Sequence, residues 1–200
     1  MSADRRPACQ SSLKIDGIHR DAIFAWNGKL RLTLERSWDD RPRVCFIGHN
    51  PSTADHLLDD PTVRRWMHFA RAWGYGGLVA VNLYPVRTPD PDKARRWADW
   101  ENSGPDWYVR DALHSNLDDA IVPETKRAGL VVACWGAIAS DQDWVEHVIE
   151  EIMTGTEPWP DIHAFGVTQG GHPIHPMARG RNRVPDHAVP VVWRTNGIAA

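Results

Sequence analysis

Three polar segments that lie far apart in the chain each follow an apolar run typical of a buried strand. Residues 44–47 lead into Gly-His-Asn-Pro-Ser-Thr at 48–53, and residues 130–134 lead into Trp135-Gly136. A third strand-like run precedes Gly-His-Pro-Ile-His-Pro at 171–176. Parallel strands end at one edge of a sheet, where open α/β proteins bind ligands. The amides and imidazoles of the three segments are therefore expected to form one binding site there.

The first of these segments also resembles a known family. Residues 48–55 read Gly-His-Asn-Pro-Ser-Thr-Ala-Asp, residues 59–62 read Asp-Asp-Pro-Thr, and residues 73–76 read Trp-Gly-Tyr-Gly. These segments resemble the bacterial and phage family DUF1643, and the resemblance covers most of residues 20–195. The family name itself implies no activity.

The order of the motifs is similar, more distantly, to the uracil-DNA glycosylase superfamily. Those enzymes carry a Gly-x-Asp/Asn/Glu-Pro-like loop, an asparagine-containing strand, an apolar strand ending in Trp-Gly or Leu-Gly, and a late His-Pro or Asn-Pro loop. Asn50, Asn82, Trp135-Gly136 and His175-Pro176 occupy these positions in order. The resemblance implies a monofunctional DNA glycosylase that hydrolyses the N-glycosidic bond of a flipped pyrimidine and requires no cofactor.

Glycosidic cleavage explains why these residue types would be needed. Negative charge builds on the departing base, so a hydrogen-bond donor aimed at a base oxygen stabilises the transition state. His175 is the predicted catalytic donor, and His172 is the competing assignment. Asn50 is predicted to hold the attacking water through its amide oxygen. Because an amide cannot take up a proton, Asn50 would position the water rather than act as a general base. Asn82 is predicted to read the Watson–Crick edge of the flipped base.

The remaining predicted substrate-binding residues are Gly48, His49, Pro51, Ser52, Trp135 and His172. Uracil-specific enzymes of the superfamily place a bulky aromatic residue directly after the motif proline, where it excludes a substituent at C5 of the base. Ser52 stands at that position here. The resemblance therefore implies a pocket open to pyrimidines enlarged at C5, including the modified bases of some phage DNAs, and hence a role in antiviral defence.

Three arginines, Arg179, Arg181 and Arg183, crowd together just after the predicted catalytic loop. They are predicted to contact DNA phosphates, and a solvated loop is the alternative interpretation. Members of the superfamily often place an apolar wedge four residues beyond the loop histidine or asparagine. Arg179 occupies that position counted from His175, which departs from the pattern.

Each predicted role has a structural alternative. Asn50 precedes a proline and can cap a helix, Asn82 can satisfy backbone groups at a strand end, and His175 can be structural. Trp135 can be a core residue rather than a stacking platform. Two other functions also fit the sequence: an N-glycosidase of free nucleotides or nucleosides, and a catalytically silent nucleic-acid-binding module.

Composition limits the class of protein. The 200 residues carry a formal net charge of −3, which excludes a generally basic nucleic-acid-coating protein but not a local basic patch. The cysteines lack metal-ligand spacing, and the acidic cluster Asp55, Asp59 and Asp60 suits helix capping better than metal binding. We find no signal peptide and no membrane-spanning stretch, and expect a cytoplasmic monomer that binds DNA, no metal and no membrane.

Strands alternate with helices along the chain, which predicts a three-layer α/β/α sandwich with a mainly parallel sheet, as in uracil-DNA glycosylase. Residues 1–18 are expected to be a flexible N-terminus, and residues 19–200 a single domain. The predicted strands are 22–26 and 29–34, joined by a two-residue Asn27-Gly28 turn, then 43–47, 77–84, 130–134, 162–167 and 189–193; helices are predicted after Asp60-Pro61, after Asp90-Pro91 and over 141–153.

Overall fold

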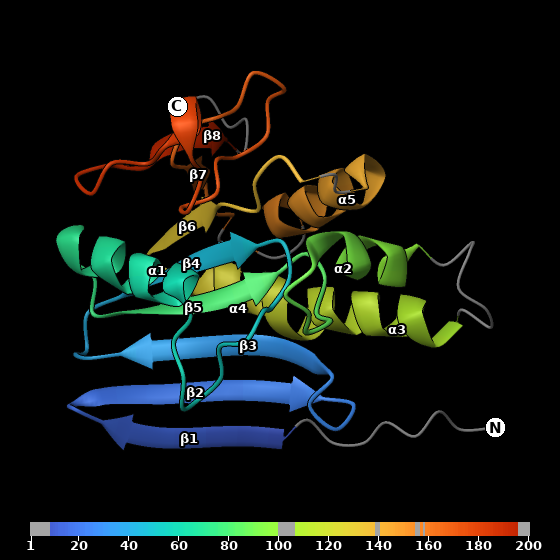
Figure 1. Cartoon of the computed structure of the whole chain (residues 1–200), viewed down its shortest axis with the longest axis horizontal. Coiled ribbons are helices and arrows are strands. Elements are labelled where there is room, and N and C mark those ends of the chain that lie inside the picture. The colour runs from blue at the N-terminus through green and yellow to red at the C-terminus, as the bar shows by residue number, and fades with distance from the viewer. Residues whose placement is uncertain (1–8, 100–106, 139–140, 155–156, 158, 196–200) are drawn as a thin grey trace.

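One mixed β-sheet organises the computed structural model, which describes residues 9–99, 107–138, 141–154, 157 and 159–195. Its eight strands lie in the order β1-β2-β3-β5-β4-β6-β7-β8 (Figure 1). The strands are β1 Cys9–Ile15, β2 Ile18–Ala25, β3 Leu30–Ser37, β4 Arg43–Gly48, β5 Gly77–Asn82, β6 Leu130–Ala133, β7 Ile162–Ala164 and β8 Val191–Arg194. The helices are α1 Pro61–Ala72, α2 Pro91–Ala98, α3 Trp107–Asn116, α4 Val122–Arg127 and α5 Gln142–Met153, with a π-helical turn Leu117–Ile121 and a 3-10 turn Gly180–Asn182.

The prediction of a mainly parallel, glycosylase-like three-layer sandwich is wrong. Of the seven strand pairings among the described residues, β1–β2, β2–β3, β3–β5 and β7–β8 are antiparallel. Only β5, β4, β6 and β7 run parallel to one another. The first three strands form a meander whose last strand pairs with β5, so the N-terminal half of the sheet is antiparallel.

The N-terminal segment also differs from its predicted description as a flexible stretch over residues 1–18. Cys9–Ile15 pairs with β2 along its whole length, and Asp16 and Gly17 form the turn with φ angles of 51° and 77°. Asp-Gly is a strong two-residue hairpin signal, because both residues tolerate positive φ. Residues 1–8 lie outside the described part of the chain.

The second hairpin confirms the predicted strands but not the predicted turn. Asn27 and Gly28 adopt positive φ angles of 53° and 79°, as expected. Trp26 also has a positive φ of 50°, so the connection between β2 and β3 is longer than the predicted two-residue turn.

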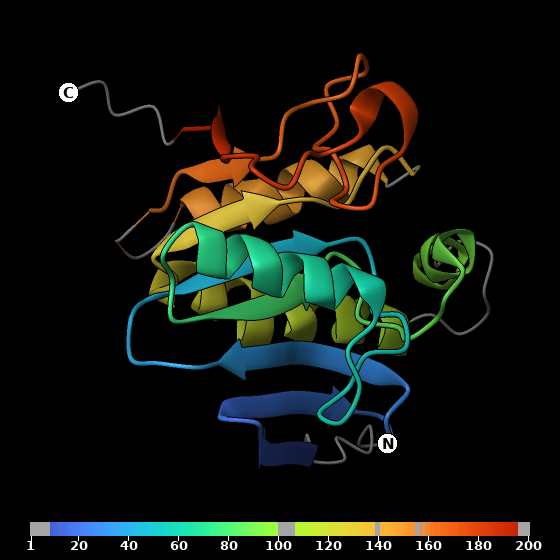
Figure 2. The ribbon, with the colours of Figure 1, turned by 60° about the vertical axis from the view of Figure 1, so that its left-hand side comes forward.

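Apolar side chains bury the centre of the sheet on both faces. Every residue of β5 is buried, as is every residue of β4 after Arg43, which explains their continuous apolar runs. Helix α1 packs on one face of these strands, whereas α2, α3 and α5 pack on the other (Figures 1 and 2). Strands β1 and β2 extend beyond the helices (Figure 1).

The predicted start of α1 is confirmed. Asp60 Oδ1 accepts a hydrogen bond from the backbone N–H of Val63 at 2.9 Å, and Pro61 stands at the first helical position. Helix α5 likewise begins after a capping aspartate, Asp141, and covers the predicted range closely.

Four segments meet at the edge of the sheet where β4, β5 and β6 end. Because β3 is antiparallel to β5, its first residues, Leu30 and Arg31, also lie at this edge. Backbone bonds then join the loops that follow the parallel strands: Leu83 N–H donates to Gly48 O at 3.0 Å, and Gly136 N–H donates to Pro173 O at 3.1 Å. The fold therefore brings together the three polar segments that the sequence singles out.

Candidate functional site

A cavity of about 180 Å³ opens at this edge of the sheet. Its volume is below the roughly 300–1,000 Å³ typical of pockets for drug-sized ligands, so it suits a single heterocycle with its substituents. Seven of the predicted site residues line it: Gly48, His49, Asn50, Ser52, Asn82, Trp135 and His175.

Gly48 and Asn82 form the floor where β4 and β5 end side by side. A Cβ atom on Gly48 would lie 2.8 Å from Asn82 Oδ1, so a larger residue at this position would displace the Asn82 amide. Asn82 is 1% exposed, and its Nδ2 has no hydrogen-bond partner among the described residues. A buried donor left without an acceptor is costly, so Asn82 is suited to bind an acceptor on a ligand.

His175 is held as a neutral proton donor. Its Nδ1 accepts a hydrogen bond from the backbone N–H of Met177 at 3.1 Å, so the neutral ring carries its proton on Nε2. Burial lowers the pKa of His175 to about 4, Asp60 opposes this shift, and His49 adds to it. A Cβ on Gly136 would lie 3.2 Å from His175 Cβ, so glycine at 136 leaves room for this placement.

Asn50 bridges two loops and orients His49. Its Nδ2 donates to the backbone oxygens of Thr88 at 2.6 Å and Pro51 at 3.0 Å, which leaves its oxygen 3.1 Å from His49 Nδ1. Because an amide oxygen only accepts, His49 carries its proton on Nδ1 and presents Nε2 as an acceptor. No helix begins at Asn50, so the capping alternative is wrong.

His49 is buried, and its Nε2 has no partner within the described part of the chain. Burial lowers its pKa, and the bond to Asn50 opposes the shift. The ring packs against Tyr84 with a centroid separation of 5.0 Å. The cavity thus contains two neutral histidines of opposite tautomer, one an acceptor at Nε2 and the other, His175, a donor.

Two tryptophans supply flat apolar walls. Trp66 stacks on Phe46 with ring centroids 5.3 Å apart, and Trp135 meets Trp193 edge-on at 5.4 Å. Both are almost fully buried yet line the cavity. Trp135 is therefore a core residue and a wall of the cavity at the same time.

The remaining predicted residues lie elsewhere. His172 lines a separate cavity of about 420 Å³ with Trp193 and Arg194, and Trp135 is shared between the two cavities. This separation favours His175 over His172 as the histidine that works with Asn50. Pro51 does not line the smaller cavity; its oxygen accepts from the N–H of Thr88 at 2.9 Å.

The three arginines Arg179, Arg181 and Arg183 are exposed in and around the 3-10 turn Gly180–Asn182. None of them forms a salt bridge with another described residue. Their guanidinium groups are thus accessible to an anionic partner, and the structure is equally compatible with a solvated loop.

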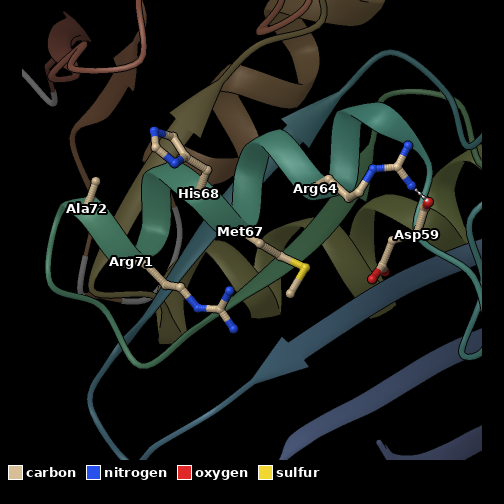
Figure 3. Close-up of a pocket in the computed structure, with 6 residues that line it drawn as sticks. All are labelled: Asp59, Arg64, Met67, His68, Arg71 and Ala72. Carbon is tan, nitrogen blue, oxygen red and sulfur yellow. Dashed lines mark hydrogen bonds between the residues drawn. The ribbon is translucent and has the colours of Figure 1, made fainter. Parts of the chain in front are cut away.

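A larger hollow of about 640 Å³ lies along α1 and contains none of the predicted residues (Figure 3). Its polar groups are exposed or already engaged: Arg64 donates to the backbone oxygen of Asp59, and the Asp59 carboxylate pairs with Arg20 and Arg36 at 2.8 Å each. We therefore place the functional site in the smaller cavity.

Sequence reasoning missed several residues of the cavity. Arg31 comes from the start of β3, a strand that the sequence presents only as half of a hairpin. Asp60 caps α1 and also lines the cavity, together with Thr88 from the loop before α2. Because β3 alternates apolar and polar residues and also carries Glu35 and Arg36, its sequence does not single out Arg31.

Three further features of the chain concern metal binding, membrane crossing and the buried cysteines. The described residues contain no group of three or more His, Cys, Asp or Glu side chains arranged to hold a metal ion. Across the same ranges, no helix has the length and apolar character needed to cross a membrane. Cys45 and Cys134 are free and buried, as expected for core residues.

The family model described as "Protein of unknown function (DUF1643)" matches residues 31–177. The chain belongs to the DUF1643 family. The DUF1643 match begins at Arg31 and ends just after His175, so it spans the whole lining of the cavity and leaves out Arg179, Arg181 and Arg183. No curated protein and no solved structure matches the chain. The comparisons thus give no support to the resemblance to uracil-DNA glycosylases.

Burial of His175 predicts a stability that depends on pH. Its pKa is about 4 in the folded protein against 6.5 ordinarily, so between these values the unfolded chain binds a proton that the folded chain does not. Its contribution is complete above about pH 6.5 and is lost as the pH falls toward 4. We expect the free energy of unfolding to fall by up to about 3 kcal/mol over this range. Urea titrations at a series of pH values measure it.

The variant His175→Gln tests the assignment. It removes the titrating group, so the pH dependence of the unfolding free energy should become shallower. The pKa of the buried His49 is also lowered, so part of the pH dependence should remain in the variant. A pH dependence identical to that of the wild type would show that the effect arises from other groups.

Proposed function

We propose that this protein is a DNA glycosylase that hydrolyses the N-glycosidic bond of a flipped pyrimidine and leaves an abasic site. One observation supports this most strongly: a neutral donor, His175, and a neutral acceptor, His49, share a small cavity with the unpartnered amide of Asn82. A pyrimidine needs those three contacts, at its oxygen, near its sugar and along its Watson–Crick edge. The proposal depends on this cavity and the order of the motifs, not on the fold.

His175 would stabilise the leaving base. As the bond from C1′ to the base breaks, electrons move onto the base and negative charge grows on its carbonyl oxygen. The Nε2–H of His175 donates to that oxygen in a site shielded from water, where such a bond is strongest. Because the pKa of His175 is low, the ring acts as a neutral donor at pH 7.

His49 would orient the nucleophilic water. Asn50 holds the Nδ1–H of His49, and the lone pair on Nε2 can accept a proton from a water molecule. The water oxygen bonds to C1′ as the base departs, and its proton passes to Nε2 and then to the released base. Asn50 is in this scheme a positioning residue, rather than the water-binding group that the sequence suggests.

The substrate range follows from the size of Ser52. A serine leaves room at C5 of the base, so the proposed substrates include C5-enlarged pyrimidines such as the modified bases of phage DNA. Removal of such bases would damage phage genomes and spare the host, which makes antiviral defence the proposed role. Hydrolysis of free nucleotides is a second candidate, favoured by the net charge of −3.

Catalysis is tested by replacing the cavity residues one at a time. His175→Ala should lower the rate of base release by about a hundredfold, the scale of losing one oriented hydrogen-bond donor. Asn50→Ala should lower it by a similar factor, because His49 loses the acceptor that fixes its tautomer. The assay counts alkali-labile sites in DNAs of different base content. His172→Ala, in the neighbouring cavity, is the matched control and should keep most of the activity. Wild-type rates for both Asn50→Ala and His175→Ala would place the active site elsewhere.

The arginine cluster is tested through the salt dependence of DNA binding. Replacing Arg179, Arg181 and Arg183 by glutamine should weaken binding and flatten the plot of log Kd against log salt, since fewer counterions are released. Arg64→Gln with Arg71→Gln, two exposed positions on α1, forms the control and should leave the slope intact. If the triple variant keeps the wild-type slope, the cluster is a solvated loop.

The open position at Ser52 makes a separate prediction about selectivity. Ser52→Tyr should abolish release of C5-enlarged bases and spare release of uracil, because the tyrosine ring fills the space beside C5. The comparison uses matched duplexes that contain uracil, thymine, 5-hydroxymethylcytosine or glucosylated 5-hydroxymethylcytosine. Equal loss on all four substrates would argue against a gating role, and release of uracil alone by the wild type would refute the open pocket.

A further inference from the structure

Arg31 stands at the end of the cavity opposite His175. The sheet places β3, β5, β4, β6 and β7 side by side (Figure 1). Arg31 belongs to β3, Asn82 ends β5, and His175 follows β7. Along this row Arg31 therefore lies beyond Asn82, on the far side from the histidine that would hold the base oxygen.

The guanidinium of Arg31 is buried and only partly used. It is 2% exposed, and its Nη1 donates to the backbone oxygen of Ala54 at 2.9 Å. Its Nε has no partner among the described residues, and it forms no ion pair with any of them. Since a guanidinium offers five N–H donors, most of the donors of Arg31 remain available for hydrogen bonds to a ligand.

Asp55, Asp59 and Asp60, the carboxylates in this part of the molecule, all accept hydrogen bonds from other groups. Asp59 pairs with Arg20 and Arg36, whereas Asp55 Oδ1 accepts from the backbone N–H groups of two residues in its own loop. Asp60, which also lines the cavity, accepts from the start of α1 through Oδ1. Asp60 attracts Arg31 without pairing with it.

The local charge therefore favours an incoming anion. Burial is the main cause that lowers the pKa of Arg31 to about 10; Asp60 and Asp55 oppose the shift, and the like charges of Arg87 and Arg36 contribute to it. Arg31 still carries its charge at pH 7. The N-terminal end of α1 also faces the cavity, where Thr62 lines it, and the positive end of the helix dipole there attracts an anion.

We propose that Arg31 anchors an oxyanion of the ligand, a phosphate or a carboxylate, at the β3 end of the cavity. A planar guanidinium binds both groups through paired N–H donors. This deepens the proposed function and rests on the cavity being the substrate site. The oxyanion has two sources in a nucleotide: its phosphate, or a carboxylate attached at C5 of the base on the side left open by Ser52.

Isothermal titration calorimetry of the full-length protein distinguishes these sources. The probes are 2′-deoxyuridine as the neutral reference, 2′-deoxyuridine 5′-monophosphate, and 5-carboxy-2′-deoxyuridine. We expect at least one anionic probe to bind about tenfold to a hundredfold more tightly than the reference, the range for charge-assisted hydrogen bonds. The anionic probe that binds more tightly than 2′-deoxyuridine identifies the source of the oxyanion. Failure of both anions to exceed the neutral nucleoside, including an absence of binding, would overturn the proposal.

Substitutions test whether Arg31 is responsible for the tighter binding of the anionic probe. Arg31→Met should remove the advantage of the anionic probe, and Arg31→Lys should keep part of it, because lysine retains the charge but lacks the paired donors. Arg87→Met is the matched control: Arg87, like Arg31, has a buried Nε without a partner among the described residues, but it packs over Phe24 and does not line the cavity, so most of the advantage should persist. An undiminished advantage in Arg31→Met would refute the assignment.

A measurement on the wild type covers the case in which Arg31→Met does not fold. The Nε–H resonance of Arg31 in ¹⁵N-arginine-labelled protein should shift saturably with the anionic probe and not with 2′-deoxyuridine. An Nε–H signal that does not respond would count against Arg31. Neither measurement depends on base release, so oxyanion binding without base release would refute the glycosylase and leave this inference standing.

Discussion

The candidate site depends on the hydrogen bonds that join the loop after β4 to the chain after β5. Leu83 and Tyr84 donate to Gly48 and His49 at 3.0 Å each, and Thr88 donates to the Pro51 oxygen at 2.9 Å. These bonds continue the β4–β5 pairing beyond the strands, so neither loop can move alone. The floor of the cavity, the imidazole of His49 and the amide of Asn82 are all fixed by this one extension of the sheet.

Burial at this edge of the sheet affects the charge of the histidines and of the arginine differently. Two histidines that lie close together in a desolvated cavity stay neutral, because each cation would be unhydrated and would repel the other. Neutral imidazoles can then differ by tautomer, and the backbone N–H of Met177 and the amide oxygen of Asn50 select opposite ones. Arginine responds differently: Arg31 keeps its charge despite burial, so the lining combines two neutral imidazoles with a cationic guanidinium and the carboxylate of Asp60.

Sequence patterns located the parts of the site better than they located the strands around it. Asp60-Pro61 marked the start of α1, and the polar segments after the strands marked seven of the residues that line the cavity, since both signals are local. The pairing of β3 with β5 joins residues forty or more positions apart and has no local signal, so the antiparallel half was missed. Arg31 was missed for the same reason, because it begins a strand, whereas the other site residues follow one. The tautomers of the two histidines depend on single backbone contacts and cannot be read from residue types.

Asparagine at position 50 illustrates how the backbone decides the chemistry. A carboxylate there would be the stronger base, and an asparagine that had to activate the water itself would give slower turnover. In the structure, however, the position faces two backbone oxygens, those of Thr88 and Pro51, and both accept from Nδ2. A carboxylate would set lone pairs against these oxygens and would release the loop before α2. The amide is therefore required to close the loop, and the acceptor role passes to His49, whose Nε2 alone of the two side chains can take up a proton.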